Sequence, residues 1–193
     1  MGRFKGVKGM ILLVIIALLI VGYYYHLSNK TVPEKEEVKQ ESLTETQKVL
    51  ARDLATNYPQ TPREVVKYFV EITKCLYNEE LTDDDVYQLG MKLREIYDDD
   101  LVANQTESEY IEQLKNDVIT NHAKEQRLFN YSLSSAVDVE TYTMDDREWA
   151  KLHCIFGITQ KKLLYNSDTV FLLRKDEKDH YKIFGWELVA KDQ

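Results

Sequence analysis

The longest hydrophobic run of the chain lies near its start and predicts a membrane-spanning helix. Residues 10–25 read MILLVIIALLIVGYYY, and Gly9 extends this uncharged run to seventeen residues. A helix that spans a bilayer usually needs about 17–25 apolar residues. Three basic residues precede the run, and positive charge resists translocation; they are Arg3, Lys5 and Lys8. We therefore expect residues 1–8 to be a cytoplasmic tail and residues 9–25 a single-pass anchor in the cell membrane, with the C-terminal domain extracellular.

A cleaved signal peptide is the main alternative for this run. A signal peptidase site needs small residues at fixed positions after the apolar stretch. Here Ile20 is large at the −3 position, and three tyrosines follow Gly22. A buried core helix is a third interpretation, but a helix of a soluble protein rarely lacks polar residues on all its faces. The pattern favours the uncleaved anchor.

The next segment, residues 26–44, predicts a flexible tether. It reads HLSNKTVPEKEEVKQESLT and has almost no large apolar side chain. Such a segment cannot bury enough apolar surface to offset the entropy lost on ordering. We expect it to hold a domain of residues 45–193 away from the membrane.

Helical spacing of apolar residues follows the tether. Residues 61–64, Thr-Pro-Arg-Glu, and residues 106–109, Thr-Glu-Ser-Glu, are capping boxes, in which the threonine and the glutamate satisfy helix N-terminal amides. A third helix is expected after Thr82, where acidic residues face the positive end of the helix dipole. A shorter helix, about residues 45–56, should end before Pro59, because the residue preceding a proline avoids helical geometry.

After about residue 127 the apolar residues alternate with polar ones, which indicates strands. Five such runs are expected, at 128–133, 137–144, 148–158, 163–174 and 180–189. The third places Ala150, Leu152, Cys154 and Phe156 on one face, and Asp145-Asp146 marks a turn before it. Helices followed by strands predict an α+β fold, with three to four helices packed on one face of a curved antiparallel sheet.

Five short segments of the chain resemble a known family. They are NYP at 57–59, TPREVV at 61–66, CLYNEELTD at 75–83, LLRKDE at 172–177 and IFGWEL at 183–188. The chain resembles, over roughly residues 45–190, small membrane-anchored Firmicutes proteins classed as a domain of unknown function. The resemblance implies a nuclear-transport-factor-2-like (NTF2-like) cone fold, an envelope location and a Gram-positive source. It carries no catalytic residue, because the family has no assigned chemistry.

Charge and cysteine content narrow the function. Residues 31–193 hold 21 Lys/Arg against 33 Asp/Glu, a net charge of −12. Such an acidic body repels phosphate backbones, so we expect no nucleic-acid partner. The two cysteines, Cys75 and Cys154, could form one disulfide or be two free buried thiols. The second interpretation is favoured, because an unpaired cysteine is among the most buried residue types.

Candidate chemistry is sparse. The carboxylates of Asp98-Asp99-Asp100 could meet a calcium ion, but the glycine and spacing of an EF-hand loop are missing, so a solvated acidic turn is expected. The histidines lack metal-ligand spacing, and no serine lies in a nucleophile motif. We therefore expect no catalytic residue, metal site or cofactor.

Aromatic residues are the strongest indication of a binding site. In a cone they would line the pocket or simply fill it as core. The candidates for a ligand pocket are Tyr68, Tyr97, Tyr131, Trp149 and Trp186.

The leading hypothesis is a membrane-tethered binding module for a protein, a peptide or a small ligand. One alternative is a cone-fold enzyme of the isomerase or dehydratase kind, which would need an open pocket with an Asp or His beside Tyr68 or Tyr131. The other alternative is a structural subunit of an envelope complex, such as a homodimer formed through the sheet. A pocket packed shut would favour the interaction module, because its function would then lie on the surface.

Overall fold

A computed structural model of the protein describes residues 43–189. Within these residues five α-helices come first, and four of them begin at a threonine whose hydroxyl accepts a hydrogen bond from the amide three residues on. The capping boxes at Thr61 and Thr106 and the start at Thr82 are confirmed. The helices are α2 (Glu45–Leu50), α3 (Pro62–Asn78), α4 (Asp83–Ile96), α5 (Asp99–Val102) and α6 (Glu107–Ala123).

Helix α2 is shorter than the sequence predicts, because an aspartate just beyond its end folds the chain into a turn. The Asp53 carboxylate accepts hydrogen bonds from the Ala55 amide, at 2.9 Å, and from the Thr56 hydroxyl, at 2.9 Å. Such local bonds compete with the helical pattern. The predicted helix therefore stops six residues early, at Leu50 instead of residue 56.

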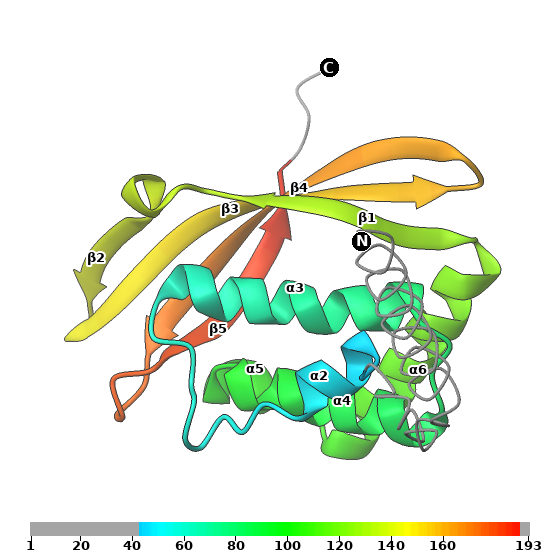
Figure 1. Cartoon of the computed structure of the whole chain (residues 1–193). Helices are drawn as coiled ribbons and strands as arrows, with labels where there is room; N and C mark the ends of the chain where they lie inside the picture. The colour runs from blue at the N-terminus through cyan, green and yellow to red at the C-terminus, as the bar shows by residue number, and fades with distance from the viewer. Residues whose placement is uncertain (1–42, 190–193) are drawn as a thin grey trace, which may run out of the picture. The chain divides into compact units, whose positions relative to one another are not determined.

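Five antiparallel strands follow the helices and form one sheet, which confirms the predicted α+β class (Figure 1). The sheet order is β1-β3-β4-β5, and β2 pairs with β3 along the same edge as β1. The run predicted at 137–144 is a strand only in its second part, since residues Ala136–Asp138 form a 3₁₀ turn. The strands are β1 (Gln126–Leu133), β2 (Glu140–Met144), β3 (Arg147–Gln160), β4 (Leu163–Lys175) and β5 (Tyr181–Leu188).

Two hairpins of this sheet turn through pairs of residues with positive φ. Asp145 and Asp146 have φ of 51° and 57°, which confirms the predicted turn. Lys161 and Lys162 have φ of 45° and 70°, and they join the two longest strands, β3 and β4. Left-handed pairs match the twist of the flanking strands, but lysine is not a usual residue there, so the second turn leaves no clear sequence signal.

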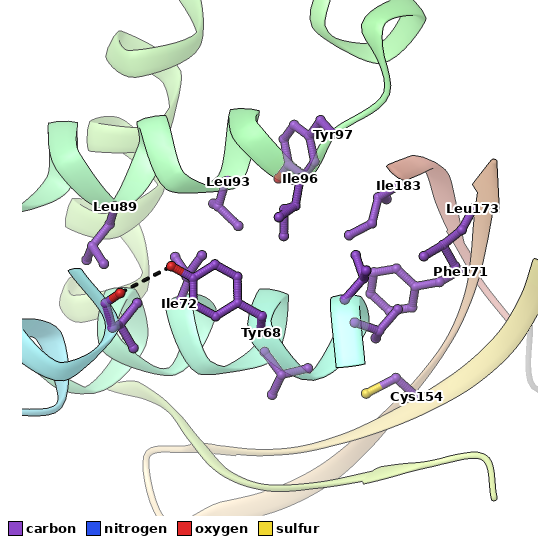
Figure 2. Packing of buried hydrophobic residues seen from close by; sticks show 14 of the residues in the cluster. Tyr68, Ile72, Leu89, Leu93, Ile96, Tyr97, Cys154, Phe171, Leu173 and Ile183 are labelled. Atoms are coloured by element: carbon purple, nitrogen blue, oxygen red, sulfur yellow. Dashed lines mark hydrogen bonds between the residues drawn. The ribbon is translucent and has the colours of Figure 1, made fainter. Parts of the chain in front are cut away.

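Helix α3 lies at the centre of the core, between the sheet and α4 (Figure 2). Leu89, Leu93 and Ile96 of α4 cover one side of it. Phe171 and Leu173 of β4 and Cys154 of β3 face its other side. As predicted, the four apolar residues of β3 that share one face are all buried. Cys75 and Cys154 are both buried and free.

The end of α4 is fastened to the outer edge of β5. Tyr97 forms a parallel bridge with Ile183, and the Asp98 amide donates to the Ile183 carbonyl at 2.9 Å. This connection places Tyr97 and α5 beside β5, which matters for the site described below.

The predicted membrane span, residues 9–25, lies outside the described residues, as does most of the predicted tether. Within residues 43–189, no helix combines the length and the hydropathy that crossing a bilayer requires.

Candidate functional site

An open cleft of about 690 Å³ lies between α3, α4, α6 and β5. Five aromatic side chains line it: Phe69 and Tyr77 of α3, Tyr97 at the end of α4, Tyr110 of α6 and Trp186 of β5. The Trp186 ring centroid lies 5.5 Å from that of Phe69 and 5.7 Å from that of Tyr97. Trp186 is nevertheless 46% exposed, so its indole is packed from behind and accessible from the cleft.

The polar side chains around these aromatics are mostly uncharged. Four carboxamides line the cleft: Asn104, Gln105, Gln113 and Asn121. The side-chain nitrogen Nε2 of Gln105 donates to the side-chain oxygen Oε1 of Gln113 at 2.9 Å. Among the lining residues that the structure describes, Arg94 and Asp117 alone carry charge, and their signs cancel. The guanidinium carbon of Arg94 lies 5.3 Å from the centroid of the Tyr110 ring.

The three tyrosines of the cleft are held in their neutral form. Burial raises the pKa of Tyr77, raises the pKa of Tyr97 well above its ordinary value, and raises the pKa of Tyr110 to about 12. The Tyr110 hydroxyl oxygen is fully buried and has no hydrogen-bond partner within the described part of the chain. None of the three hydroxyls is therefore ionised near neutral pH, so none can act as a general base there.

Tyr68 and Tyr131 lie together in a different hollow, of about 770 Å³, between α2, α3 and β1. Tyr68 is only 1% exposed, and its hydroxyl donates to the Val49 carbonyl at 3.1 Å. Tyr131 is 36% exposed. The described residues that line this hollow include neither Asp nor His. Burial raises the pKa of the Cys75 thiol there to about 11, which keeps it protonated and a poor nucleophile.

Trp149 lies on the face of the sheet that points away from the helices. Its neighbour Ala150 faces the core, and successive strand residues point to opposite faces. Trp149 is 4% exposed, and its indole nitrogen donates to the Met144 carbonyl at 3.1 Å. Its ring stacks on Tyr142 at 6.4 Å and meets Phe184 edge-on at 5.0 Å. The structure therefore separates Trp149 from both hollows.

An ion pair covers Trp149 and Phe184 of this aromatic group, whereas Tyr142 at its rim is 41% exposed. The Arg174 guanidinium carbon lies 5.4 Å from the Trp149 ring centroid and 5.0 Å from that of Phe184. The guanidinium binds both oxygens of Asp98, with one distance of 2.9 Å, and it also binds Asp100 at 2.7 Å. We call Tyr142, Trp149, Phe184 and Arg174 the sealed cluster.

The expectation of a solvated acidic turn at residues 98–100 is wrong for its first member. Asp98 is only 3% exposed and caps α5 by accepting the Asp100 amide at 3.0 Å. Its partner Arg174 comes from β4, far along the chain. The hydrogen bond to Asp98 also raises the pKa of Arg174, so the guanidinium stays charged at any ordinary pH. Local sequence could not reveal this burial, because the residue that causes it is remote.

A family model described as a domain of unknown function (DUF6715) matches residues 1–186. The chain belongs to this family. The predicted resemblance to an uncharacterised family is thereby confirmed. A comparison with curated proteins finds no match.

Of the five pocket candidates in this DUF6715 protein, Tyr97 and Trp186 meet in the aromatic cleft, Tyr68 and Tyr131 meet in the second hollow, and Trp149 joins neither. Sequence reasoning missed Tyr77, Tyr110 and the carboxamides. Helical spacing could have found some of them, because residues 110, 114, 117 and 121 of α6 recur every three to four positions and line the cleft together. The alternation in β3 could have placed Trp149 on the far face.

The chemistry available in the cleft is hydrogen bonding and stacking. Its lining contains no Ser, Cys or His among the described residues, and its tyrosine hydroxyls are neutral. The Thr73 hydroxyl is already engaged, since it donates to the Phe69 carbonyl at 2.8 Å. The arrangement therefore suits the holding of a molecule better than proton transfer or nucleophilic attack.

Proposed function

We propose that this domain is a binding module that holds a small ligand in the cleft between α3, α4, α6 and β5. The observation that carries the proposal is the cleft itself: about 690 Å³, open, with an exposed indole and uncharged polar groups around it. Its size falls within the roughly 300–1,000 Å³ of small-molecule sites, which combine apolar walls with a few polar groups. An open cleft favours a small ligand over a binding surface that lies only on the outside of the domain.

An enzyme of the isomerase or dehydratase kind has weaker support. The open volume is one of the two features that such an enzyme needs. The second is an Asp or His beside Tyr68 or Tyr131, and the hollow around them has neither among the described residues. Its carboxylates are three glutamates that already have partners: Glu45 pairs with Lys48, Glu71 pairs with Lys67, and Glu79 accepts the Thr46 hydroxyl. In the aromatic cleft the carboxylate is Asp117, on the same helix as Tyr110. The binding module therefore remains the better-supported proposal.

We also propose that the module is tethered to the outer side of the cell membrane. The uncharged run of residues 9–25 and the basic residues before it support this placement. A nuclear-transport-factor-2-like cone and a Firmicutes source are the corresponding proposals for fold family and origin. The helices on one face of the sheet, and the irregular registers at Leu128/Asn130 and Leu172/Leu173, support the cone, because bulges bend sheets.

The proposal is tested by filling the cleft. Thr73→Trp places an indole among the lining residues, whereas Thr120→Trp adds the same side chain at an exposed position of α6 that does not line the cleft. A library of small, chemically diverse compounds is screened against the full chain in lipid nanodiscs by ligand-observed NMR. We expect compounds that bind the wild type and Thr120→Trp to lose binding to Thr73→Trp. If Thr73→Trp binds the same compounds equally well, the cleft is not the site.

A further inference from the structure

We propose that the ligand of this cleft is an uncharged carbohydrate, an inference that rests on the binding function proposed above. Three features of the cleft lead to it: a rigid exposed indole, carboxamides in place of charges, and a bordering strand edge that is already paired at Ile183. Each of them restricts the chemistry of the occupant.

The indole of Trp186 offers a flat apolar platform. Trp186 lies opposite Phe171 in the sheet, and its ring centroid lies 6.2 Å from that of Phe171. Phe69 and Tyr97 hold it from two further directions. A ring packed on three aromatic neighbours has little freedom to lose on binding, which favours affinity. A pyranose ring has one face made of C–H bonds, and that face can lie flat on such a platform.

The carboxamides fit hydroxyl groups. A carboxamide carries two donor hydrogens and an acceptor oxygen, and a sugar hydroxyl both donates and accepts. A ligand with a formal charge would instead be met by side chains of opposite charge, whose hydrogen bonds are stronger. Here the single cation, Arg94, and the single anion, Asp117, balance each other among the described lining residues.

The scarcity of charge is a property of the cleft and not of the whole chain. The protein holds 25 Lys/Arg and 33 Asp/Glu among 193 residues, so charged side chains are common elsewhere on its surface. A net negative body also repels anionic ligands at a distance. Neutral polar groups at the cleft therefore select an uncharged, hydroxyl-rich molecule.

A peptide is the other ligand rich in neutral polar groups, and the structure favours it less. An extended peptide gains affinity by pairing with a free strand edge, and a helical peptide needs a mainly apolar groove. The strand that borders this cleft is β5, whose outer edge pairs at Ile183 with Tyr97 and Asp98, so an added strand cannot run along its full length. The opposite edge of the sheet, formed by β1 and β2, lies on the other side of β3 and β4.

The test compares neutral oligosaccharides, acidic oligosaccharides and peptides as probes. The full chain is placed in lipid nanodiscs, because sugar-based detergents would compete for the cleft. Binding is first detected on an array and then measured by titration calorimetry. We expect the neutral oligosaccharides to bind, and Trp186→Ala to weaken that binding by at least about tenfold, which corresponds to about 1.4 kcal/mol.

A second variant adds a charge to the cleft without changing the shape of a side chain. Gln113→Glu keeps the shape of the side chain but adds a negative charge inside the cleft, and we expect at least about a tenfold loss of affinity for the neutral sugar with an unchanged melting temperature. Gln88→Glu makes the same change at an exposed position of α4 outside the cleft, and it should leave affinity unchanged.

The possible results distinguish a failure of the carbohydrate inference from a failure of the proposed binding function. If library compounds bind in the cleft but neutral sugars do not, or if acidic sugars or peptides bind there more tightly, the carbohydrate inference is wrong and the binding module stands. If no probe of any class distinguishes the wild type from Thr73→Trp, both proposals fail. Equal binding of a neutral sugar to the Gln113→Glu and Gln88→Glu variants also overturns the inference.

Discussion

Two groups of aromatic side chains lie on opposite faces of the same sheet, and they differ in how far their tryptophan is exposed to solvent. The sealed cluster around Trp149 is closed by Arg174, which binds the buried carboxylate of Asp98. The cleft around Trp186 has no such closure, and its indole is 46% exposed against 4% for Trp149. Aromatic residues alone therefore do not make a binding site; the groups that surround them decide whether the rings become core or remain accessible.

A single short segment connects the two groups. Tyr97 lines the cleft, and the next residue, Asp98, pairs with Arg174 in the sealed cluster. The backbone of both residues is held against Ile183 of β5. The sealed cluster therefore positions one wall of the cleft, because the ion pair fixes the segment from which Tyr97 projects.

The largest loss of stability is expected when the ion pair between Arg174 and Asp98 is removed. Arg174→Met leaves Asp98 buried without its partner, and an uncompensated buried charge costs about 3–5 kcal/mol. The free energy of unfolding, measured by guanidinium denaturation, should fall by that amount. The neighbouring substitution Lys175→Met serves as the control, because Lys175 pairs with Glu148 and Asp179 near the surface. An exposed pair contributes about 0–1 kcal/mol. Equal losses for the two variants would show that the Asp98 pair is not special.

The two tryptophans allow the closed and open groups to be compared directly. Trp149→Ala removes a buried ring and should lower the free energy of unfolding by about 3–5 kcal/mol. Trp186→Ala should lower it by roughly 1–2 kcal/mol, because nearly half of that side chain already lies in water. Urea denaturation of both variants measures the difference. In the single-tryptophan proteins, acrylamide should quench Trp186 emission more strongly than Trp149 emission; the reverse order would contradict this placement.

The fold should also lose stability at alkaline pH, because two cysteine thiols are buried in its core. Burial raises the pKa of Cys75 from 9.0 to about 11 and that of Cys154 from 9.0 to about 12. Because the folded pKa exceeds the unfolded one, this stability is complete below pH 9 and is lost as pH rises through 11 to 12. Each thiol should contribute a loss of roughly 1.4 kcal/mol per pH unit within its window. The measurement is the denaturation midpoint at pH 8, 9 and 10, with Cys75→Ala/Cys154→Ala as the control whose midpoint should change less over the same interval.

The smallest change in stability is expected for a substitution of Tyr110, which lines the open cleft. Tyr110→Phe removes a buried hydroxyl that has no described partner, so stability should stay constant or rise by up to about 1 kcal/mol. Tyr68→Phe makes the same chemical change where the hydroxyl donates to the Val49 carbonyl, and it should cost about 1 kcal/mol. Thermal unfolding of the two variants tests the contrast. Matching losses would mean that the Tyr110 hydroxyl is satisfied after all.

Elements that depend on neighbouring residues could be predicted from the sequence. The starts at Thr61, Thr82 and Thr106 and the turn at Asp145-Asp146 each involve groups within about four positions, so the sequence displays the whole interaction. The alternation in β3 also predicted correctly which of its residues are buried. Where a local interaction left no familiar signature, as at Lys161-Lys162, the prediction gave only the flanking strands.

The site depended on contacts between remote elements. Two of the five aromatic candidates, Tyr97 and Trp186, meet in the cleft, because the end of α4 pairs with β5. Asp98 was expected in water, and a strand residue far along the chain buries it instead. Neither fact can be found by spacing, since spacing describes one element at a time.

The sequence by itself determined where the helices capped by Thr61, Thr82 and Thr106 begin, which residues of β3 share a face, and the chain's membership of DUF6715. The tertiary structure alone decided that Trp149 is sealed and Trp186 is open. The physical reason is that caps, turns and alternation arise from bonds between near neighbours, whereas a cleft is the space that helices and a sheet leave between them, and its boundary belongs to no single segment.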